Sequence, residues 1–324
     1  YVLAKPLSII FNAAIESSSF PSVWKRAKIC PILKKGDPSM IPNYRQIAIL
    51  SNFSKVFEQV LYSAIYNHVK NYISPQQHGF VSGRSTVTNL ATVTQYLAEK
   101  IDNRGQVDII YTDFSRAFDT IQHNILLHKL SYFGLTDSAL ALIRSYLYDR
   151  VAYVFYNGYA SSEFIVASGV PQGSNLGPLL FILFINDLLL QLSCPALAYA
   201  DDVKLYHEIS SVGNMDLLQL NLNRIIQWCE RFKLNLNVDK CCTVTYTRTL
   251  TPLNTSYYID DHLLEKKHSM KDLGVWFDAK LTFLPHLDNV CSSSLKSLGF
   301  VMRISKYFSD ISLIKKLYYA YVLS

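Results

Sequence analysis

The spacing of apolar residues divides the chain into a helical first part and a mixed remainder. Over residues 1–105 most apolar positions recur at three or four residues, which is typical of amphipathic helices. At Val107 the period changes to two and predicts a strand that ends at Asp113. The clearest helical stripe consists of Leu50, Phe53, Phe57, Val60, Leu61 and Ile65.

The remainder of the chain alternates predicted helices with predicted strands. In order, the pattern indicates a helix over 121–130, a hairpin over 151–170 that turns near Gly158, a helix from Pro178 to about Leu192, two short strands over 197–206, a helix over 214–233, a strand over 242–247 and a helical tail from 285. This order predicts an α+β fold built on an antiparallel sheet.

Composition and charge exclude several classes of protein. Half of the 324 residues are hydrophobic and 17% are charged, so we expect a sizeable core and no wholesale disorder. The longest apolar run covers only 179–185, whereas a membrane span needs about 20 residues, so we expect no membrane segment. A net charge of +6 permits a polyanionic partner without requiring one. The six cysteines lack zinc spacing, and we interpret them as reduced thiols of an intracellular protein rather than as a disulfide framework.

Three aspartates carry the candidate chemistry. Asp113 ends one predicted strand, and Asp201 and Asp202 form the turn between two others. Aspartates in such positions can simply form turns or cap helices. Three carboxylates at one edge of a sheet can instead hold two divalent cations about 4 Å apart for phosphoryl transfer. Oxygen ligands with no His or Cys nearby select Mg²⁺ rather than Zn²⁺.

Five sequence blocks around these acids stand in the order of a known family. They are DFSRAFD at 113–119, GVPQGS at 169–174, YADD at 199–202, LNVDK at 236–240 and LGV at 273–275. These blocks resemble the signature of reverse transcriptases. Residues 24–25, 31–37, 43–45 and 277–283 are similar to segments of jockey-like non-LTR (LINE-type) retrotransposon polyproteins, and the resemblance covers about residues 20–300.

The resemblance implies a fold and an activity. The fold is a right-hand polymerase with fingers, an antiparallel-sheet palm and a partial thumb. We expect the fingers over 1–105, with 126–165 returning to the border of fingers and palm, the palm over 106–284, and the start of a truncated thumb over 285–324. The implied activity is that of an RNA-directed DNA polymerase, which adds dNTPs to the 3′-hydroxyl of a DNA primer on an RNA template.

The resemblance also assigns the metal ligands. Asp113, Asp201 and Asp202, with the main-chain carbonyl of Phe114, would bind two Mg²⁺ ions or Mn²⁺ in their place, Asp202 being the outermost ligand. Lys240 would protonate the leaving pyrophosphate, although an ordinary exposed lysine is the alternative.

Further residues are implied to contact the nucleotide and the primer. Lys34 and Arg45 would bind the triphosphate, and Gln172 would lie against the incoming nucleotide and the template. The alternatives are solvated surface cations and a turn without function. The Leu273-Gly274-Val275 segment would support the primer end, unless it is only a buried strand turn.

Phe118 and Asp119 predict different sugars in the incoming nucleotide. An aromatic at Phe118 resembles the family's gate, which crowds the 2′ position and favours dNTPs. RNA-copying viral polymerases instead carry an acid after the first aspartate that hydrogen-bonds the 2′-hydroxyl, and Asp119 stands in such a place. We favour the Phe118 gate and expect Asp119 to cap the following helix.

Two departures from the family pattern and two rival functions remain. Gln46 replaces a proline and Val81 replaces an arginine, while Arg84 is retained. One rival function is a degenerate copy that only binds nucleic acid, and the other is an RNA-dependent RNA polymerase. The presence of all three acids speaks against the degenerate copy.

The basic tail and the family resemblance indicate what the polymerase would meet in the cell. Basic positions in the tail either follow a duplex backbone or are solvated. The resemblance implies a nuclear protein, and we expect the endonuclease of such elements elsewhere in the parent reading frame. The basic positions are Lys296, Arg303, Lys306, Lys315 and Lys316.

Overall fold

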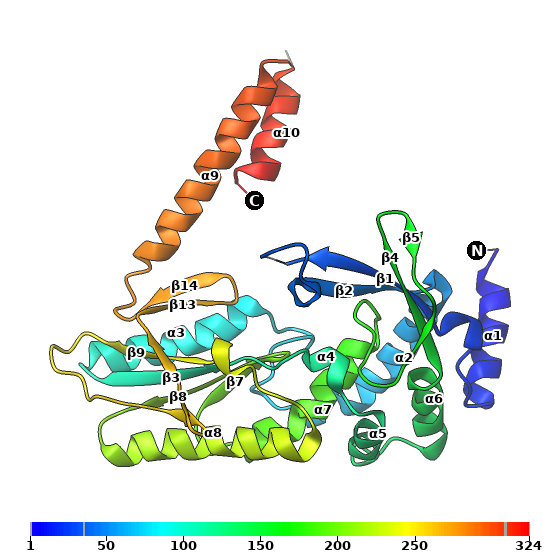
Figure 1. Ribbon diagram of the computed structural model, residues 1–324, viewed down its shortest axis with the longest axis horizontal. Helices are drawn as coiled ribbons and strands as arrows, with labels where there is room; N and C mark the ends of the chain where they lie inside the picture. Colours follow the sequence, from blue (N-terminus) through cyan, green and yellow to red (C-terminus); the bar gives the residue numbers. More distant parts are fainter. Residues whose placement is uncertain (1, 35, 308–309, 324) are drawn as a thin grey trace.

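Helices pack around two larger sheets in a computed structural model that describes residues 2–34, 36–307 and 310–323 (Figure 1). The helices are α1 Ala4–Glu16, α2 Asn52–Val69, α3 Thr86–Asp102, α4 Ala117–Thr120, α5 His123–Ser131, α6 Asp137–Leu147, α7 Gly177–Gln191, α8 Val212–Phe232, α9 Leu284–Ser305 and α10 Ile311–Tyr321. The strands are β1 Arg26–Leu33, β2 Tyr44–Ile49, β3 Gln106–Thr112, β4 Arg150–Tyr156, β5 Tyr159–Ala160, β6 Phe164–Val166, β7 Ala196–Tyr199, β8 Asp202–Glu208, β9 Cys242–Thr247, β10 Tyr258–Ile259, β11 His262–Leu263, β12 Glu265–Lys267, β13 Ser269–Asp272 and β14 Val275–Asp278. The mixture of helix and sheet confirms the predicted fold class.

The central sheet has the strand order β12-β9-β3-β8-β7. Strand β3 pairs antiparallel with β8 and β9, whereas β12 joins the edge parallel to β9. The predicted strand at 107 is confirmed, but both of its faces are buried. Val107 and Ile109 pack with residues of α3, while Ile110 faces the core formed with α7 and α8. The alternation therefore separates two apolar layers rather than core from solvent.

The second sheet, which we call the hairpin sheet, has the order β2-β1-β4-β5, with β6 also paired to β4. Here the prediction of a mostly helical first third is wrong in part, because β1 and β2 form an antiparallel hairpin. Strand β1 pairs in parallel with β4, more than 100 residues later in the chain. A strand whose partner is so remote leaves little local signal. The predicted hairpin over 151–170 is confirmed and turns at Asn157-Gly158.

The helices on and around the sheets follow the predicted pattern with one correction. Helix α7, with Pro178 in its first turn, is buried along almost its whole length, as expected for an apolar central helix. In α2, Phe57, Leu61 and Ile65 face the core. Phe53 and Val60 of the predicted stripe are 44% and 46% exposed, so the apolar face is narrower than the pattern indicated.

The C-terminal part ends in two helices that extend away from the sheets (Figure 1). Strands β13 and β14 form a separate two-stranded hairpin, and α9 runs from it away from the sheets (Figure 1). Helix α10 folds back against α9, and Val301 is the buried residue of α9. The predicted helical tail is therefore confirmed, and its basic side chains are exposed. The division into fingers, palm and thumb at the predicted residue bounds stays a prediction.

Two expectations from composition can be compared with the structure. All six cysteines lie among the described residues, and all are free thiols. Within the described ranges, no helix has both the length and the apolar character needed to cross a bilayer.

Candidate active site

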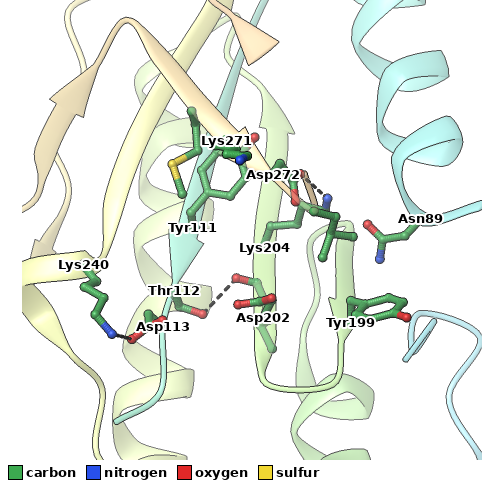
Figure 2. A pocket seen from close by; sticks show the side chains of 13 residues that line it. Asn89, Tyr111, Thr112, Asp113, Tyr199, Asp202, Lys204, Lys240, Lys271 and Asp272 are labelled. Atoms are coloured by element: carbon green, nitrogen blue, oxygen red, sulfur yellow. Dashed lines mark hydrogen bonds and ion pairs between the residues drawn. The ribbon is translucent and has the colours of Figure 1, made fainter. Parts of the chain in front are cut away.

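Asp113 and Asp202 lie at the same end of the central sheet. Asp113 follows the last residue of β3, and Asp202 begins β8. Thr112 stands opposite Val203 in the antiparallel register, so the next pair along the two strands brings Asp113 beside Asp202. Figure 2 shows the two acids on adjacent strands, with the Thr112 hydroxyl donating to the Val203 carbonyl at 2.9 Å. This juxtaposition was predicted from the sequence.

The turn of the YADD block is held by a segment that sequence reasoning did not single out. Ala200, in this turn, has a φ of +58°, which a residue with a Cβ rarely adopts. The buried Gln77 side chain accepts a hydrogen bond from Ala200 N at 2.9 Å and another from Gly79 N at 2.8 Å. A Cβ on Gly79 would come within 2.3 Å of Ala200 N. Residues 76–79 thus form a cradle around the turn.

The LNVDK block holds Asp113 from the other side. The backbone at 235–237 runs beside the residues that follow β3. Asn237 N donates to the Asp113 carbonyl at 2.8 Å, and Ser115 N donates to the Asn235 carbonyl at 2.7 Å. The same block places the Lys240 ammonium 2.9 Å from Asp113 Oδ2, although Lys240 is 56% exposed (Figure 2). The structure therefore brings Lys240 and Asp113 together, and their roles stay predictions.

Burial and charge repulsion govern the electrostatics of the two acids in the YADD turn, Asp201 and Asp202. The carboxylate of Asp202 is accessible to solvent, but many protein atoms lie around it at longer range, and these lower its hydration. Burial, then the charges of Asp201 and Asp113, raise the pKa of Asp202 to about 6. Burial and then the Asp113 charge raise the pKa of Asp201, and the cations Arg45 and Lys34 partly offset this.

The acids suit a hard cation by chemistry, although their side chains are not gathered around one point. Within the described part of the chain, no group of three or more His, Cys, Asp or Glu side chains is close enough to hold a metal ion. The donor set consists of carboxylate oxygens whose charges repel one another, and a divalent cation would relieve that repulsion. The metal-ligand roles of Asp113, Phe114, Asp201 and Asp202 stay predictions.

Lys34 and Arg45 lie on the hairpin sheet. Lys34 follows β1 and Arg45 stands on β2, opposite Ile32, and both side chains are exposed. Both cations act electrostatically on Asp201, and Lys34 also acts on Asp119. The hairpin therefore directs positive charge toward the acids, which is what binding of a triphosphate beside them requires.

Phe118 lies in α4, one short turn beyond Asp113. The turn passes through Arg116, whose φ is +50°. The Phe118 ring stacks on Phe181 with the ring centroids 4.3 Å apart, and Phe80 meets it edge-on at 6.3 Å. These two contacts restrict the ring to one orientation, a requirement for a steric gate.

The expectation that Asp119 caps the following helix is wrong. Asp119 lies inside α4, and α5 begins after Gln122. Its carboxylate instead accepts a hydrogen bond from the Gln172 side-chain amide at 3.4 Å. Burial raises the pKa of Asp119, while Arg116 and Lys34 act in the opposite direction. Asp119 therefore orients Gln172.

The loop that carries Gln172 is fixed between α4 and the hairpin sheet. The Gln172 carbonyl accepts from Ala48 N of β2 at 2.9 Å, and Val170 N donates to the Phe118 carbonyl at 2.8 Å. The buried Glu58 of α2 holds the end of this loop, because its carboxylate accepts from Asn175 N at 2.9 Å. Sequence reasoning missed Glu58, although an acid beside Phe57 on an apolar helix face was a usable signal.

The LGV segment forms the tip of the β13–β14 hairpin. Leu273 and Gly274 make the turn with φ values of +44° and +97°, and Val275 begins β14. Leu273 lines a pocket of about 150 Å³. The same pocket is lined by residues of β3, of β8, of the LNVDK block and of the hairpin. Among them are Asp113, which follows β3, Asp202, Lys204, Lys240 and Asp272 (Figure 2). The expected turn is present beside the acids, and its contact with a primer stays a prediction.

The two departures from the family pattern have mild structural consequences. Gln46 lies on β2, an edge strand, where proline and glutamine are both tolerated. Val81 packs partly buried against the core. The retained Arg84 donates to the carbonyls of Ser74, at 2.9 Å, and of Gln77, so it stabilises the cradle around the YADD turn.

Comparisons with known proteins agree with this arrangement. Residues 32–277 match a family model described as "Reverse transcriptase (RNA-dependent DNA polymerase)". In Drosophila melanogaster, the probable RNA-directed DNA polymerase from transposon BS is 31% identical over 304 residues, which cover 87% of this chain and 32% of the relative. The RNA-directed DNA polymerase from mobile element jockey is 29% identical over 296 residues, which cover 88% of this chain and 32% of the relative. The chain thus spans about a third of the length of these relatives.

Solved structures show the same fold at low identity. Apo telomerase from Candida tropicalis, truncated from its C-terminal domain, superposes with a TM-score of 0.56 and 13% identity over 85% of this chain and 58% of that chain. Telomerase from Candida albicans, in complex with a TWJ fragment of telomeric RNA, gives a TM-score of 0.53 and 13% identity over 94% of this chain and 55% of that chain. The polymerase fold predicted from the sequence blocks is confirmed. By its sequence blocks, its fold and its match to the family model, the chain belongs to the reverse transcriptase family.

Proposed function

We propose that this chain is the catalytic part of an RNA-directed DNA polymerase of a non-LTR retrotransposon. Its substrates would be an RNA template, a DNA primer with a 3′-hydroxyl, and dNTPs. The observation that carries the proposal is the placement of Asp113 beside the YADD turn on paired strands, with Lys240 2.9 Å from Asp113. The relatives named as RNA-directed DNA polymerases support the same reaction.

We propose two Mg²⁺ ions, replaceable by Mn²⁺, as the cofactor. Asp113, Asp201, Asp202 and the carbonyl of Phe114 would hold them. When bound, such ions activate the attacking hydroxyl and neutralise the leaving pyrophosphate. Support comes from the oxygen-only donor set and from the burial and charge repulsion that together raise the pKa of Asp202 to about 6.

The remaining residues of the site would bind, orient and transfer a proton. Lys34 and Arg45 would bind the triphosphate from the hairpin sheet, and Gln172, oriented by Asp119, would lie against the nucleotide. Lys240 would give its proton to the pyrophosphate oxygen. The geometry that supports this is the ion pair of Lys240, because a lysine that touches a site carboxylate is within reach of the reacting groups.

Two further roles concern the sugar and the primer. Phe118 would exclude a 2′-hydroxyl by overlap, since its ring is held by Phe80 and Phe181. The turn at Leu273-Gly274-Val275 would support the primer end beside the pocket that Asp113 and Asp202 line.

Primer extension tests the proposed reaction. We expect the protein to extend oligo(dT) on poly(rA) with dTTP and Mg²⁺, and to lose this activity when Mg²⁺ is removed with EDTA. Asp201→Asn should nearly abolish extension while the protein still folds, whereas Asp261→Asn, at an exposed hairpin turn, should extend at the parental rate. Duplex binding without any extension by the parental protein would support the degenerate, binding-only copy. Extension with rNTPs but not with dNTPs would support an RNA polymerase.

The place of action is part of the same proposal. We propose that the protein acts in the nucleus, where an endonuclease carried elsewhere in the parent reading frame would provide the primer end. The relatives, about three times as long as the matched region, leave room for such a part. Imaging of the full-length parent protein, tagged at its N-terminus, tests this location, and exclusion from the nucleus would contradict it.

A further inference from the structure

A buried ion pair joins the β13–β14 hairpin, which carries the LGV segment at its tip, to β8, the strand that begins at Asp202. The Lys204 ammonium contacts the Asp272 carboxylate, and the two side chains are only 4% and 7% exposed. Lys204 stands on β8, two residues after Asp202, and Asp272 is the last residue of β13 before the turn at Leu273-Gly274. Figure 2 shows the pair inside the pocket, above Asp202 on the same strand.

Beyond its base, where β12 pairs with β9 one residue before β13 begins, the β13–β14 hairpin depends on side chains for its placement. Among the described residues, its strands pair with each other and with no strand of the central sheet. Its base is tied by one backbone hydrogen bond, from Thr247 N at the end of β9 to the Ala279 carbonyl at 2.9 Å. Its middle is held by Phe277, which is buried in the core above the sheet. The ion pair is therefore the polar attachment nearest to the tip.

The ion pair connects the tip to the site along a short and rigid path. Side chains two residues apart on a strand project from the same face, and their positions differ by about 7 Å along the strand. Lys204 therefore shares a face with Asp202, and Asp272 is adjacent to Leu273. The register fixes β8 further, because Tyr111 of β3 stands opposite Lys204.

Stability alone explains the pair poorly. Removing two charges from water costs about as much as their attraction returns, so a well-packed apolar pair would often stabilise a protein equally well. A buried ion pair does, however, select one arrangement of the parts that it joins, because any displacement leaves two unpaired charges.

We infer that the Lys204–Asp272 pair is a positioning device that sets the LGV tip, and with it the primer 3′ end, relative to the Asp201-Asp202 turn. The inference rests on the proposed polymerase function. Neither residue is a catalytic group: they act by fixing where the hairpin lies. The reaction is sensitive to such placement, since a misplacement of about 1 Å can cost about 100-fold in rate.

A set of matched variants tests this inference. Lys204→Met and Asp272→Leu each leave one buried charge, and their combination replaces the pair by apolar side chains. The control is Lys267→Met with Glu265→Leu, which removes a more exposed ion pair on β12. Each protein is measured by thermal unfolding, by Kd for an RNA–DNA duplex, by kcat for addition of one dNTP, and by hydrogen exchange of the segment 269–278.

The expected results distinguish a role of the ion pair in placing the hairpin from a role in the stability of the fold. Each single variant should unfold at a lower temperature, and the double variant should recover the parental Tm. The double variant should nevertheless lose about 10- to 100-fold in kcat, with Kd for the duplex changed by less than about threefold. Its segment 269–278 should exchange faster than in the parent, while the β12 control should match the parent in every measurement.

Two outcomes would overturn the inference or its basis, and they are distinguishable. A double variant with parental kcat and parental exchange over 269–278 would show that the pair contributes stability alone. A parental protein that extends no primer would refute the proposed function, but exchange over 269–278 would still decide whether the pair holds the hairpin in place.

Discussion

The side chain of Gln77 brackets the backbone of Ala200 on both sides. Its oxygen accepts from Ala200 N at 2.9 Å, and its amide donates to the Ala200 carbonyl at 3.4 Å, across 123 residues of sequence. Gln77 is 1% exposed, so water cannot replace these bonds. An apparently unremarkable glutamine thus stabilises the left-handed residue that turns the chain between Tyr199 and Asp201.

Gln77→Leu should weaken both stability and catalysis. It leaves Ala200 N and Gly79 N buried without an acceptor, and an unsatisfied buried group costs about 1–3 kcal/mol, so the free energy of unfolding should fall by about 2 kcal/mol. Because the turn also carries Asp201, kcat should fall by about 10-fold or more. Urea unfolding and single-nucleotide addition measure the two effects. Gln95→Leu, at an exposed position of α3, is the control and should change neither quantity.

Gly79→Ala tests the cradle by overlap rather than by lost hydrogen bonds. The added methyl group would lie 2.3 Å from Ala200 N and 2.9 Å from the Tyr199 carbonyl carbon, both of which are backbone atoms that cannot rotate away. We expect the turn to be displaced and extension to fall by at least about 100-fold. Gly213→Ala, where the added methyl group would lie 3.8 Å from its nearest neighbour, should extend primers normally. Normal extension by Gly79→Ala would mean that the turn need not hold this position.

The sequence predicted those parts of the site whose conformation depends on residues adjacent in the chain. The strand before Asp113, the turn at Asp201-Asp202 and the helix after Pro178 each depend on residues adjacent in sequence, and all three are present. The blocks assigned Lys240 and Asp113 to one site, and the structure joins the two side chains by an ion pair of 2.9 Å.

Other parts could not be predicted because they depend on contacts between residues far apart in the sequence. Strand β1 completes its pairing with β4, and Gln77 meets Ala200 across 123 residues. Lys204 and Asp272 are 68 residues apart, and each alone resembles a surface charge. Asp119 was misassigned for the same reason: helix capping is a local inference, whereas its hydrogen bond to Gln172 depends on a loop 53 residues later.

The raised pKa of Asp202 predicts a pH-dependent stability. An acid whose folded pKa is about 6, above its ordinary value of 3.8, binds its proton more tightly when folded. Asp202 therefore adds to the free energy of unfolding at low pH, and this stabilisation is lost as pH rises from about 4 to 6. Asp202→Asn removes this loss, so with EDTA present the variant should gain Tm relative to the parent between pH 4 and pH 7. Asp261→Asn should show a constant difference. A pH-independent difference for Asp202→Asn would contradict the electrostatic account.

The choice of sugar tests the aromatic gate and separates two neighbouring residues. Phe118→Val removes a ring that Phe80 and Phe181 hold in place, so rNTP incorporation should rise strongly while dNTP incorporation changes little. Asp119→Ala frees the Gln172 amide, so KM should rise for both sugars by a similar factor and the ratio should stay constant. The measurement is kcat/KM for dTTP and UTP in both variants. The opposite result would be a selective loss of rNTP incorporation in Asp119→Ala and no change in Phe118→Val. Asp119 would then bind the 2′-hydroxyl, and the chain would be an RNA polymerase.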